Sequence, residues 1–327
     1  MSDKRSCNNC ETDVDTVDSY FATHQSESMI PNLLSWQNMT DAAACLKTGK
    51  ATSSFIKPEH VLCGSLELMY YLHLLFNALL THSYVPHEFL LGTISPIVKD
   101  TSADCSSSSN YRPITLGPIF LQIFENALLQ KFGHYWHSDN LQFAYKRAHS
   151  TSHALFVLKS CVDYYTSHGS NVLVTFLDCS KAFDTISHHG IFLKMMDRGV
   201  PLSFLKLVMY WCSNMKSRVC WEQEFSDYFD VLSGVKQGGV LSPRIFTFYV
   251  DGLIKKLRHD RKGCYLLSYF VASIMYADDL CLLAPSRGAM QRLLSICEEF
   301  CQEYCLTFNA RKSKSLVFGK CDIHTIQ

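Results

Sequence analysis

The sequence predicts a mixed α/β fold in which an antiparallel sheet is backed by helices and follows a helix-rich region. Two apolar, strand-like runs, residues 172–177 and 273–283, carry acidic residues where a strand ends or turns. Segments with the apolar spacing of helices, residues 66–80 and 120–132, precede both runs. Apolar segments on both sides of a tight acidic turn are typical of a buried hairpin, so residues 273–283 predict two paired antiparallel strands.

The composition indicates a folded protein without a net charge that favours nucleic acid. The 327-residue chain is 47% hydrophobic, which is enough to bury the core of one or two subdomains. It has 30 Lys and Arg residues against 30 Asp and Glu residues, whereas proteins that hold a long duplex usually gain affinity from excess positive charge. Local basic clusters, such as residues 255–258 and 311–314, are either a basic track or solvated faces of helices and loops.

Cysteine usage and hydropathy predict an intracellular protein, without distinguishing nucleus from cytoplasm. The 15 cysteines have no repeated spacing and no signal peptide precedes them, so we expect thiols in a reducing compartment. The most apolar helical run, residues 68–80, is interrupted by His73 and Asn77 and is too short to span a bilayer. We therefore expect no membrane anchor.

Residues 1–45 are predicted to form a weakly ordered N-terminal segment. They contain few apolar residues in any period and an acidic patch between Glu11 and Asp18. Cys7 and Cys10 form a lone Cys-x-x-Cys pair, whereas a zinc site needs four ligands. No second pair follows at a suitable spacing, so this pair does not predict a zinc site.

The remaining elements follow from spacing and from turn residues. Residues 66–80 have apolar side chains at helical spacing, and Pro86 marks the exit from that helix. Residues 102–109 are rich in serine and predict a flexible tip. Residues 120–132 and 245–253 predict two further helices, the first amphipathic and the second apolar.

Acidic residues at strand ends predict a metal site. Asp278 and Asp279 lie between the two strands of the predicted hairpin, and Asp178 ends the upstream strand in the same way. Adjacent buried carboxylates repel each other strongly unless a cation or a proton neutralises them. An isolated Asp-Asp pair is most often a solvated turn, but two such strand ends side by side would form a two-metal site for Mg²⁺.

A polar, glycine-rich loop lies between the acidic strands. Residues 233–243 read Ser-Gly-Val-Lys-Gln-Gly-Gly-Val-Leu-Ser-Pro and lead into the apolar helix. Such a loop allows a backbone to approach a ligand closely. Its place in the chain between the acidic strands favours a functional site over a pair of solvated turns.

These segments, in this order, resemble the palm motifs of reverse transcriptases, and they are most similar to those of non-LTR, LINE-like retrotransposons. The motifs are, in order, Asp178-Cys179-Ser180-Lys181-Ala182-Phe183-Asp184, Gln237-Gly238-Gly239 with Leu241-Ser242-Pro243, Tyr276-Ala277-Asp278-Asp279, and residues 306–314. Upstream, residues 94–99 and 110–116 resemble two fingers motifs, and the resemblance covers residues 46–320. Group II intron maturases share Tyr-Ala-Asp-Asp but differ around the first motif, and nucleotide cyclases lack the Gln-Gly loop.

The resemblance implies a right-hand polymerase palm with an antiparallel sheet plus helix-rich fingers. The reverse transcriptase domain would cover residues 46–327, with fingers over 46–170 and the palm over 171–320, and the chain is expected to stop before the thumb. The implied activity is that of an RNA-directed DNA polymerase, a nucleotidyltransferase that uses two Mg²⁺ ions, or Mn²⁺ in their place. Its partners would be an RNA template, a DNA primer and deoxynucleoside triphosphates. The alternative is a catalytically inactive retrotransposon remnant that at most binds nucleic acid.

The resemblance also implies roles for individual residues. Asp178 and Asp278 would be ligands of both metal ions, Asp279 would contact the ion on the primer side, and the Cys179 backbone carbonyl would add an oxygen. The Phe183 ring would collide with a ribose 2′ hydroxyl and so select deoxynucleotides. The other implied substrate-binding residues are Gln237 and Gly238 on the nucleotide and template side, Lys99 and Arg112 at the triphosphate, and Lys312 at the leaving pyrophosphate.

Overall fold

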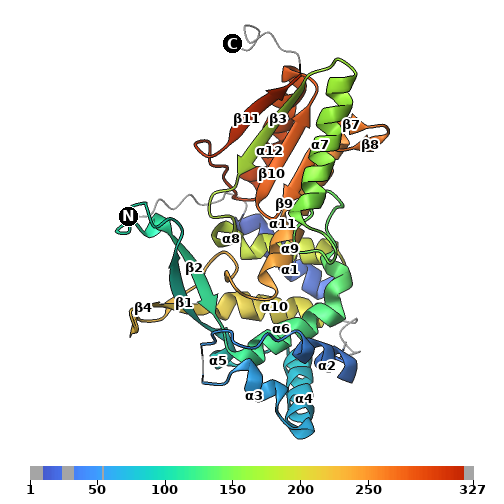
Figure 1. Ribbon diagram of the computed structural model, residues 1–327. Helices are drawn as coiled ribbons and strands as arrows, with labels where there is room; N and C mark the ends of the chain where they lie inside the picture. Colours follow the sequence, from blue (N-terminus) through green and yellow to red (C-terminus); the bar gives the residue numbers. More distant parts are fainter. Residues whose placement is uncertain (1–9, 24–32, 54, 320–327) are drawn as a thin grey trace. The chain divides into compact units, whose positions relative to one another are not determined.

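The computed structural model describes residues 10–23, 33–53 and 55–319 (Figure 1). Contacts within the chain divide it into two compact units. The first unit combines Met1–Trp136 with Ser187–Ser242, and the second combines His137–Ile186 with Pro243–Gln327. Each unit thus draws on two stretches of sequence, whereas the fingers and palm are expected as consecutive stretches; those subdomain boundaries stay a prediction.

Many helices belong to the first unit, and several of them, among them α2 and α4, begin at serine side chains. The Ser35 and Ser65 hydroxyl groups accept hydrogen bonds from backbone N–H groups in the first turns of α2 and α4. Helix α4 ends at Ser83, whose backbone is left-handed with φ 50°. The helices of this unit are α1 (Cys10–Thr23), α2 (Trp36–Ala44), α3 (Pro58–Leu62), α4 (Leu66–His82), α5 (His87–Leu90), α6 (Ile119–Phe132), α9 (His188–Asp197) and α10 (Leu202–Asn214), with short 3-10 turns at η2 (Ser108–Asn110) and η3 (Gly133–Trp136).

The N-terminal stretch contains the first two of these helices. Helices α1 and α2 both lie within residues 1–45, for which weak order stays a prediction. The lone Cys-x-x-Cys pair begins at Cys7, which lies outside the described residues. No zinc site is proposed there.

A mixed sheet completes the first unit. Its strand order is β2 (Tyr111–Leu116), β1 (Leu91–Val98), β4 (Lys216–Trp221) and β5 (Glu224–Phe225), with β6 (Phe229–Asp230) also paired to β4. Strand β1 runs antiparallel to β2 and parallel to β4. Helices α1 to α6 all lie before Asp178 in the sequence, which confirms the helix-rich region predicted ahead of the first acidic strand.

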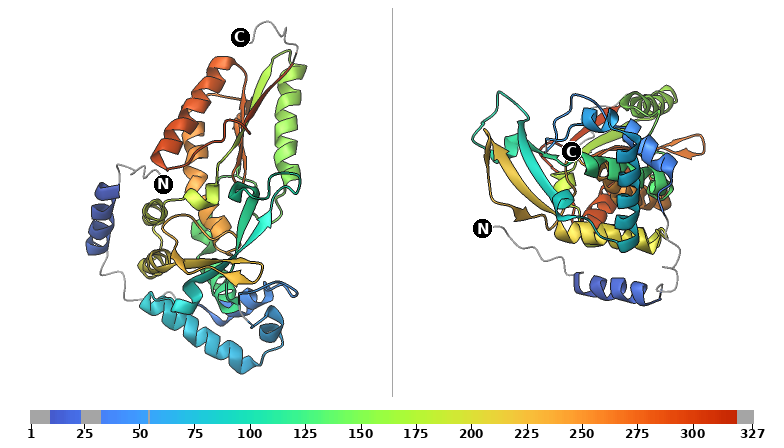
Figure 2. Two further views of the ribbon diagram at one scale, coloured as in Figure 1. Left: turned by 90° about the vertical axis from the view of Figure 1, so that its left-hand side faces the viewer. Right: turned by 90° about the horizontal axis from the view of Figure 1, so that it is seen from below.

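The second unit is built on an antiparallel sheet with the order β11-β3-β10-β9. Its strands are β3 (Val172–Asp178), β9 (Ser273–Tyr276), β10 (Asp279–Ala284) and β11 (Lys314–Phe318), and a small hairpin is formed by β7 (Tyr265–Leu266) and β8 (Tyr269–Phe270). Helices α7 (Thr151–Ser167) and α12 (Arg287–Glu303) cover opposite faces of this sheet (Figures 1 and 2). The unit also contains α8 (Ala182–Thr185) and most of α11 (Ser242–Asp260). The predicted mixed α/β class with an antiparallel sheet is confirmed.

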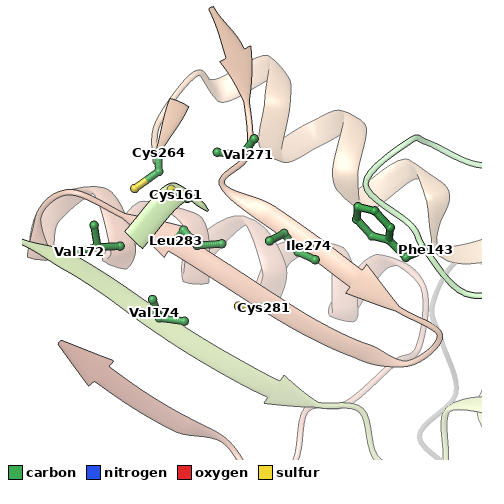
Figure 3. Packing of buried hydrophobic residues seen from close by; sticks show 9 residues of the cluster. All are labelled: Phe143, Cys161, Val172, Val174, Cys264, Val271, Ile274, Cys281 and Leu283. Atoms are coloured by element: carbon green, nitrogen blue, oxygen red, sulfur yellow. The ribbon is translucent and has the colours of Figure 1, made fainter. Parts of the chain in front are cut away.

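Figure 3 shows the apolar core on the face of this sheet that α7 covers. Val172 and Val174 of β3 pack there with Leu283 of β10 and Cys161 of α7. The two valines alternate along the strand and are fully buried, as expected for a strand with one face against a helix. This packing fixes the neighbouring strands β3 and β10, whose ends carry the acidic residues.

Cysteines in both units are free thiols, including Cys45 in the first and Cys305 in the second. Cys297 and Cys301 on α12 are buried and act as small apolar side chains. Among the residues with a described position, no helix combines the length and apolar character needed to cross a membrane.

Candidate active site

Two strands of the second unit bring acidic residues to one end of its sheet. In the antiparallel pairing of β3 with β10, Asp178 lies opposite Asp279. Asp278 precedes Asp279 in the turn from β9 and follows Ala277, whose φ of 57° is left-handed. The turn interrupts the alternation of strand side chains, which is the condition for Asp278 and Asp279 to serve one site. The three expected carboxylates thus occur together at this end of the sheet.

The charges at this end of the sheet act on one another. Burial raises the pKa of Asp279, and the negative charges of Asp278 and Asp178 raise it further. The Lys312 ammonium opposes this rise, and its Nζ lies 3.7 Å from Oδ2 of Asp178. Because this ion pair is partly exposed, it contributes little to stability. Its effect is to neutralise part of the negative charge at the carboxylates.

Cys179 offers a backbone oxygen rather than a thiolate. Burial raises the pKa of its thiol to about 11, and the charges of Asp278 and Asp178 act in the same direction. The thiol therefore stays protonated near neutral pH. The bridge between Cys179 and Phe308 is made by flanking atoms, with Ser180 N–H donating to the Thr307 carbonyl at 2.8 Å. The Cys179 carbonyl does not take part in that bond.

The donor atoms at this site fit a hard divalent cation. Carboxylate and carbonyl oxygens are the ligands that Mg²⁺ and Mn²⁺ prefer. As they stand, no three His, Cys, Asp or Glu side chains of the described ranges are grouped closely enough to hold a metal ion. Asp178, Asp278 and Asp279 repel one another, and a divalent cation is the group that would draw their oxygens together.

Phe183 lies in the short helix α8, just beyond the strand that ends at Asp178. Its ring stacks on the Phe246 ring of α11, with 4.7 Å between centroids and 15° between planes. The residue before α8, Lys181, has a left-handed backbone with φ 48°. The stack restrains the Phe183 ring, so the ring would limit the size of a ligand bound beside it.

The first unit carries the expected nucleotide- and template-side residues. The Thr115 N–H of β2 donates to the Gln237 carbonyl at 2.6 Å. Gly238 has φ 115°, and a Cβ added there would lie 2.7 Å from the Thr115 carbonyl oxygen. Glycine adopts this positive φ without strain and has no Cβ to collide with the Thr115 carbonyl. The loop backbone therefore lies directly against β2.

Two charged residues that sequence reasoning did not single out hold this loop. Oε2 of Glu125, on α6, accepts a hydrogen bond from the Val240 N–H at 2.8 Å, and Nζ of Lys236 donates to the Leu90 carbonyl at 2.7 Å. Burial raises the pKa of Glu125 to about 7 and lowers the pKa of Lys236 to about 8. The available signal was that Glu125 is the one acidic residue of the predicted helix over residues 120–132.

Lys99 and Arg112 lie at one end of the β1–β2 hairpin. The Arg112 position is opposite Ile97, and both Lys99 and Arg112 are exposed. Nζ of Lys99 donates to the Ser109 carbonyl at 2.8 Å. The expected site residues thus fall into two groups, with Lys99, Arg112, Gln237 and Gly238 in the first unit and Asp178, Cys179, Phe183, Asp278, Asp279 and Lys312 in the second.

Comparison with known proteins identifies the family. The family model described as reverse transcriptase (RNA-dependent DNA polymerase) matches residues 98–322, well over half of the chain. The chain belongs to the reverse transcriptase family.

The relatives of this reverse transcriptase domain include proteins of non-LTR retrotransposons, which confirms the LINE-like resemblance. The retrovirus-related Pol polyprotein from type-1 retrotransposable element R2 of Nasonia vitripennis is 26% identical over 74% of this chain and 23% of its own length. The probable RNA-directed DNA polymerase from transposon X-element of Drosophila melanogaster is 27% identical over 76% of this chain and 27% of its own length. The chain therefore spans about a quarter of the length of these relatives.

Solved structures show the fold of the reverse transcriptase domain. The apo telomerase from Candida tropicalis truncated from its C-terminal domain has a TM-score of 0.53 at 12% identity and covers 83% of this chain and 59% of its own. The telomerase from Candida tropicalis in complex with a TWJ fragment of telomeric RNA has a TM-score of 0.52 at 12% identity, over 73% of this chain and 42% of its own. Reverse transcriptases generally use divalent metals, which is the class of cation that the donor oxygens described above prefer.

Proposed function

We propose that this chain catalyses RNA-directed DNA synthesis, adding deoxynucleotides to a DNA primer on an RNA template. The observation that carries the proposal is the register of β3 with β10, which sets Asp178 opposite Asp279 while Asp278 lies in the adjoining turn. Their mutual repulsion and the raised pKa of Asp279 support the proposal, because a bound cation would stabilise such a site. Nucleotidyl transfer requires such a site because it depends mainly on positioning and charge neutralisation.

The proposed ligands come from the acidic end of the second unit. Asp178 and Asp278 would be shared by two Mg²⁺ ions, Asp279 would serve the ion on the primer side, and the Cys179 carbonyl would add an oxygen. When bound, these ions activate the primer 3′ hydroxyl and neutralise charge on the phosphates. Mn²⁺ would occupy the same oxygen ligands.

The proposed substrate contacts are divided between the two groups of residues. Phe183, restrained by its stack on Phe246, would exclude a 2′ hydroxyl and so select deoxynucleoside triphosphates. Lys312 would hold or protonate the leaving pyrophosphate. Arg112 and Lys99 would bind the triphosphate, Arg112 through two parallel hydrogen bonds, and the Gln237 and Gly238 backbone would line the nucleotide and template side. These substrates imply action inside the cell, in nucleus or cytoplasm.

Primer extension on a primed RNA template tests the proposal directly. The assay uses deoxynucleotides with Mg²⁺ and compares the parent chain with Asp278→Asn, which removes one charge and keeps the side-chain shape. Extension by the parent and a loss of about a thousandfold or more in the variant support the enzyme. Circular dichroism and a thermal melt show whether both proteins are folded.

The alternative is a remnant that at most binds nucleic acid, and the balance of 30 basic and 30 acidic residues favours it. If neither folded protein extends a primer with Mg²⁺ or Mn²⁺, the enzyme proposal fails. Retained binding of the RNA–DNA duplex by those proteins would then identify a binding remnant.

A further inference from the structure

Residues 138–146 of the second unit form a segment outside the acidic motifs. This segment pairs with β9, the strand that leads into the acidic turn. Gln142 forms a parallel bridge with Met275 of β9. The Phe143 N–H donates to the Met275 carbonyl at 2.9 Å, and the Met275 N–H donates to the Leu141 carbonyl at 2.8 Å. Figure 3 shows the Phe143 ring beside Ile274 at this edge of the apolar cluster. Backbone and side-chain contacts thus fix the segment against β9.

The Gln142 side chain forms hydrogen bonds to both backbone groups of Ala277. Its Oε1 accepts from the Ala277 N–H at 3.0 Å, and its Nε2 donates to the Ala277 carbonyl at 3.1 Å. Oε1 also accepts from the Ala144 N–H at 3.1 Å. Gln142 is 1% exposed, so water does not replace these bonds if the amide is removed.

Ala277 needs such support because of its backbone conformation. Its φ of 57° is left-handed, a region that residues other than glycine and asparagine adopt at a cost. Ala277 directly precedes Asp278, so its backbone angles set the direction of that side chain. Nearby, burial and then the negative charge of Asp278 raise the pKa of Tyr145. The segment that carries Gln142 therefore lies close to the carboxylates as well as to the turn.

Helix α11 anchors the segment that carries Gln142. The Asp139 carboxylate accepts hydrogen bonds from Nη1 and Nη2 of Arg258, with 2.7 Å between Nη2 and Oδ1. The Asp139 N–H donates to the Asp251 carboxylate. The Asp139 carbonyl in turn accepts from the Gln142 N–H at 3.0 Å. Nζ of Lys146 donates to the Ser138 carbonyl at 3.1 Å, which ties the other end of the segment back. These hydrogen bonds hold the backbone on both sides of Gln142 in place.

We propose that Gln142 is a positioning residue for the polymerase reaction, because its buried amide holds Ala277 in the left-handed turn that aims Asp278 and Asp279. The inference rests on the proposed function for its catalytic consequence, but its structural core concerns the turn alone. A displacement of about 1 Å at a reacting centre costs about a hundredfold in rate. Loss of the amide should thus lower kcat while leaving the nucleotide-binding residues unchanged.

The test compares Gln142→Met, which removes all three hydrogen bonds at similar volume, with Gln142→Glu, which keeps the two that Oε1 accepts. The matched control is Thr175→Val, which deletes the hydrogen bond of a buried threonine to Ser315 in the same sheet, 2.9 Å long, away from the turn. Hydrogen exchange of a peptide over residues 273–281 reports on the turn. Primer extension gives kcat and the KM for a deoxynucleotide.

We expect Gln142→Met to speed exchange in this peptide by about tenfold or more, and to lower kcat by about tenfold to a hundredfold with KM within about threefold. Gln142→Glu should fall between Gln142→Met and the parent, and Thr175→Val should leave both readouts near the parent values. If Gln142→Met does not fold, Gln142→Glu decides by the same two readouts. Exchange and kcat like the parent's in the folded variants, or changes equal to those of Thr175→Val, overturn the inference.

The two readouts separate this inference from the proposed function. If the parent extends no primer, the polymerase proposal fails and the exchange comparison still decides whether Gln142 holds the turn. If the parent is active and the exchange of the turn peptide is unchanged in the folded Gln142 variants, the positioning role of Gln142 is wrong and the polymerase proposal stands.

Discussion

At the scale of single residues, the proposed role of Phe183 depends on a contact of the kind found in cores. Its ring is restrained by the parallel stack on Phe246, with 4.7 Å between centroids. In the proposed role, a ring restrained in this way would reject a 2′ hydroxyl by steric contact rather than through a lost hydrogen bond. Because the stack is formed within the second unit, it exists before any nucleotide binds.

We predict that Phe183→Val relaxes sugar selection. The smaller side chain leaves room for a 2′ hydroxyl, so the ratio of kcat/KM for deoxynucleotides over ribonucleotides should fall by about tenfold or more. Single-nucleotide extension with each sugar measures the ratio. Phe156→Val, at a 71% exposed ring on α7, is the control and should keep the parent ratio. An unchanged ratio in an active Phe183→Val protein would assign the ring to packing alone.

At the scale of elements, α6 and the glycine-rich loop are linked through two buried charged side chains, Glu125 and Lys236. Glu125 accepts from the Val240 N–H, and Lys236 donates to the Leu90 carbonyl. A Cβ on Gly239 would lie 3.5 Å from Oε1 of Glu125, so α6 and the loop are in direct contact. The pair therefore couples the loop to protonation, since each charge is buried and depends on its partner.

We predict that Glu125 makes the protein less stable as the pH rises towards neutral. Its pKa is about 7 in the folded chain against an ordinary value of 4.5, so the folded state binds more protons between these values. The stability that this proton provides is complete below pH 4.5 and is lost as the pH rises through 7. Relative to Glu125→Gln, the free energy of unfolding of the parent should fall by about 2 kcal/mol from about pH 5 to about pH 8.

Urea unfolding of both proteins at the two pH values measures this difference. Lys236 acts in the same direction, because loss of the Glu125 charge lowers its pKa further and makes the variant gain stability with rising pH. Glu88→Gln, at an exposed position of α5, is the control and should track the parent at both values. Equal pH profiles for the parent and Glu125→Gln would show that Glu125 ionises normally in the folded chain.

At the scale of the whole molecule, the sequence predicted what local patterns encode and missed what long-range contacts create. The strands around Asp178 and Asp279 were predictable because apolar runs end in carboxylates, and the antiparallel pairing of β9 with β10 follows from a hairpin. The register of β3 with β10 joins distant parts of the sequence and needed the structure. The contact of Gln142 with Ala277 was not predictable, because it joins residues 135 apart in the sequence. Glu125 was hidden in the same way, since helical spacing does not tell which loop covers a helix face.

The distribution of charge could also be settled only with contacts in view. The basic cluster on α11 is largely paired with acidic residues of the second unit: Lys255 with Asp251 at 3.0 Å, Lys256 with Glu303, and Arg258 with Asp139. Cations engaged in this way are less available to phosphates. The chain therefore has no net charge, and the positive charges of this cluster are largely neutralised by ion pairs within the protein.

We predict weak binding of an RNA–DNA duplex with a shallow salt dependence. Few phosphates are neutralised, so Kd should be about micromolar or weaker near 0.15 M salt, and log K should fall with log salt at a slope of about −3 or shallower. Fluorescence anisotropy over a salt series measures both quantities. Glu303→Gln releases Lys256 and should tighten binding and steepen the slope by up to about one unit, whereas Glu88→Gln should do neither. Nanomolar binding with a slope of about −6 in the parent would show that these ion pairs open when the duplex binds.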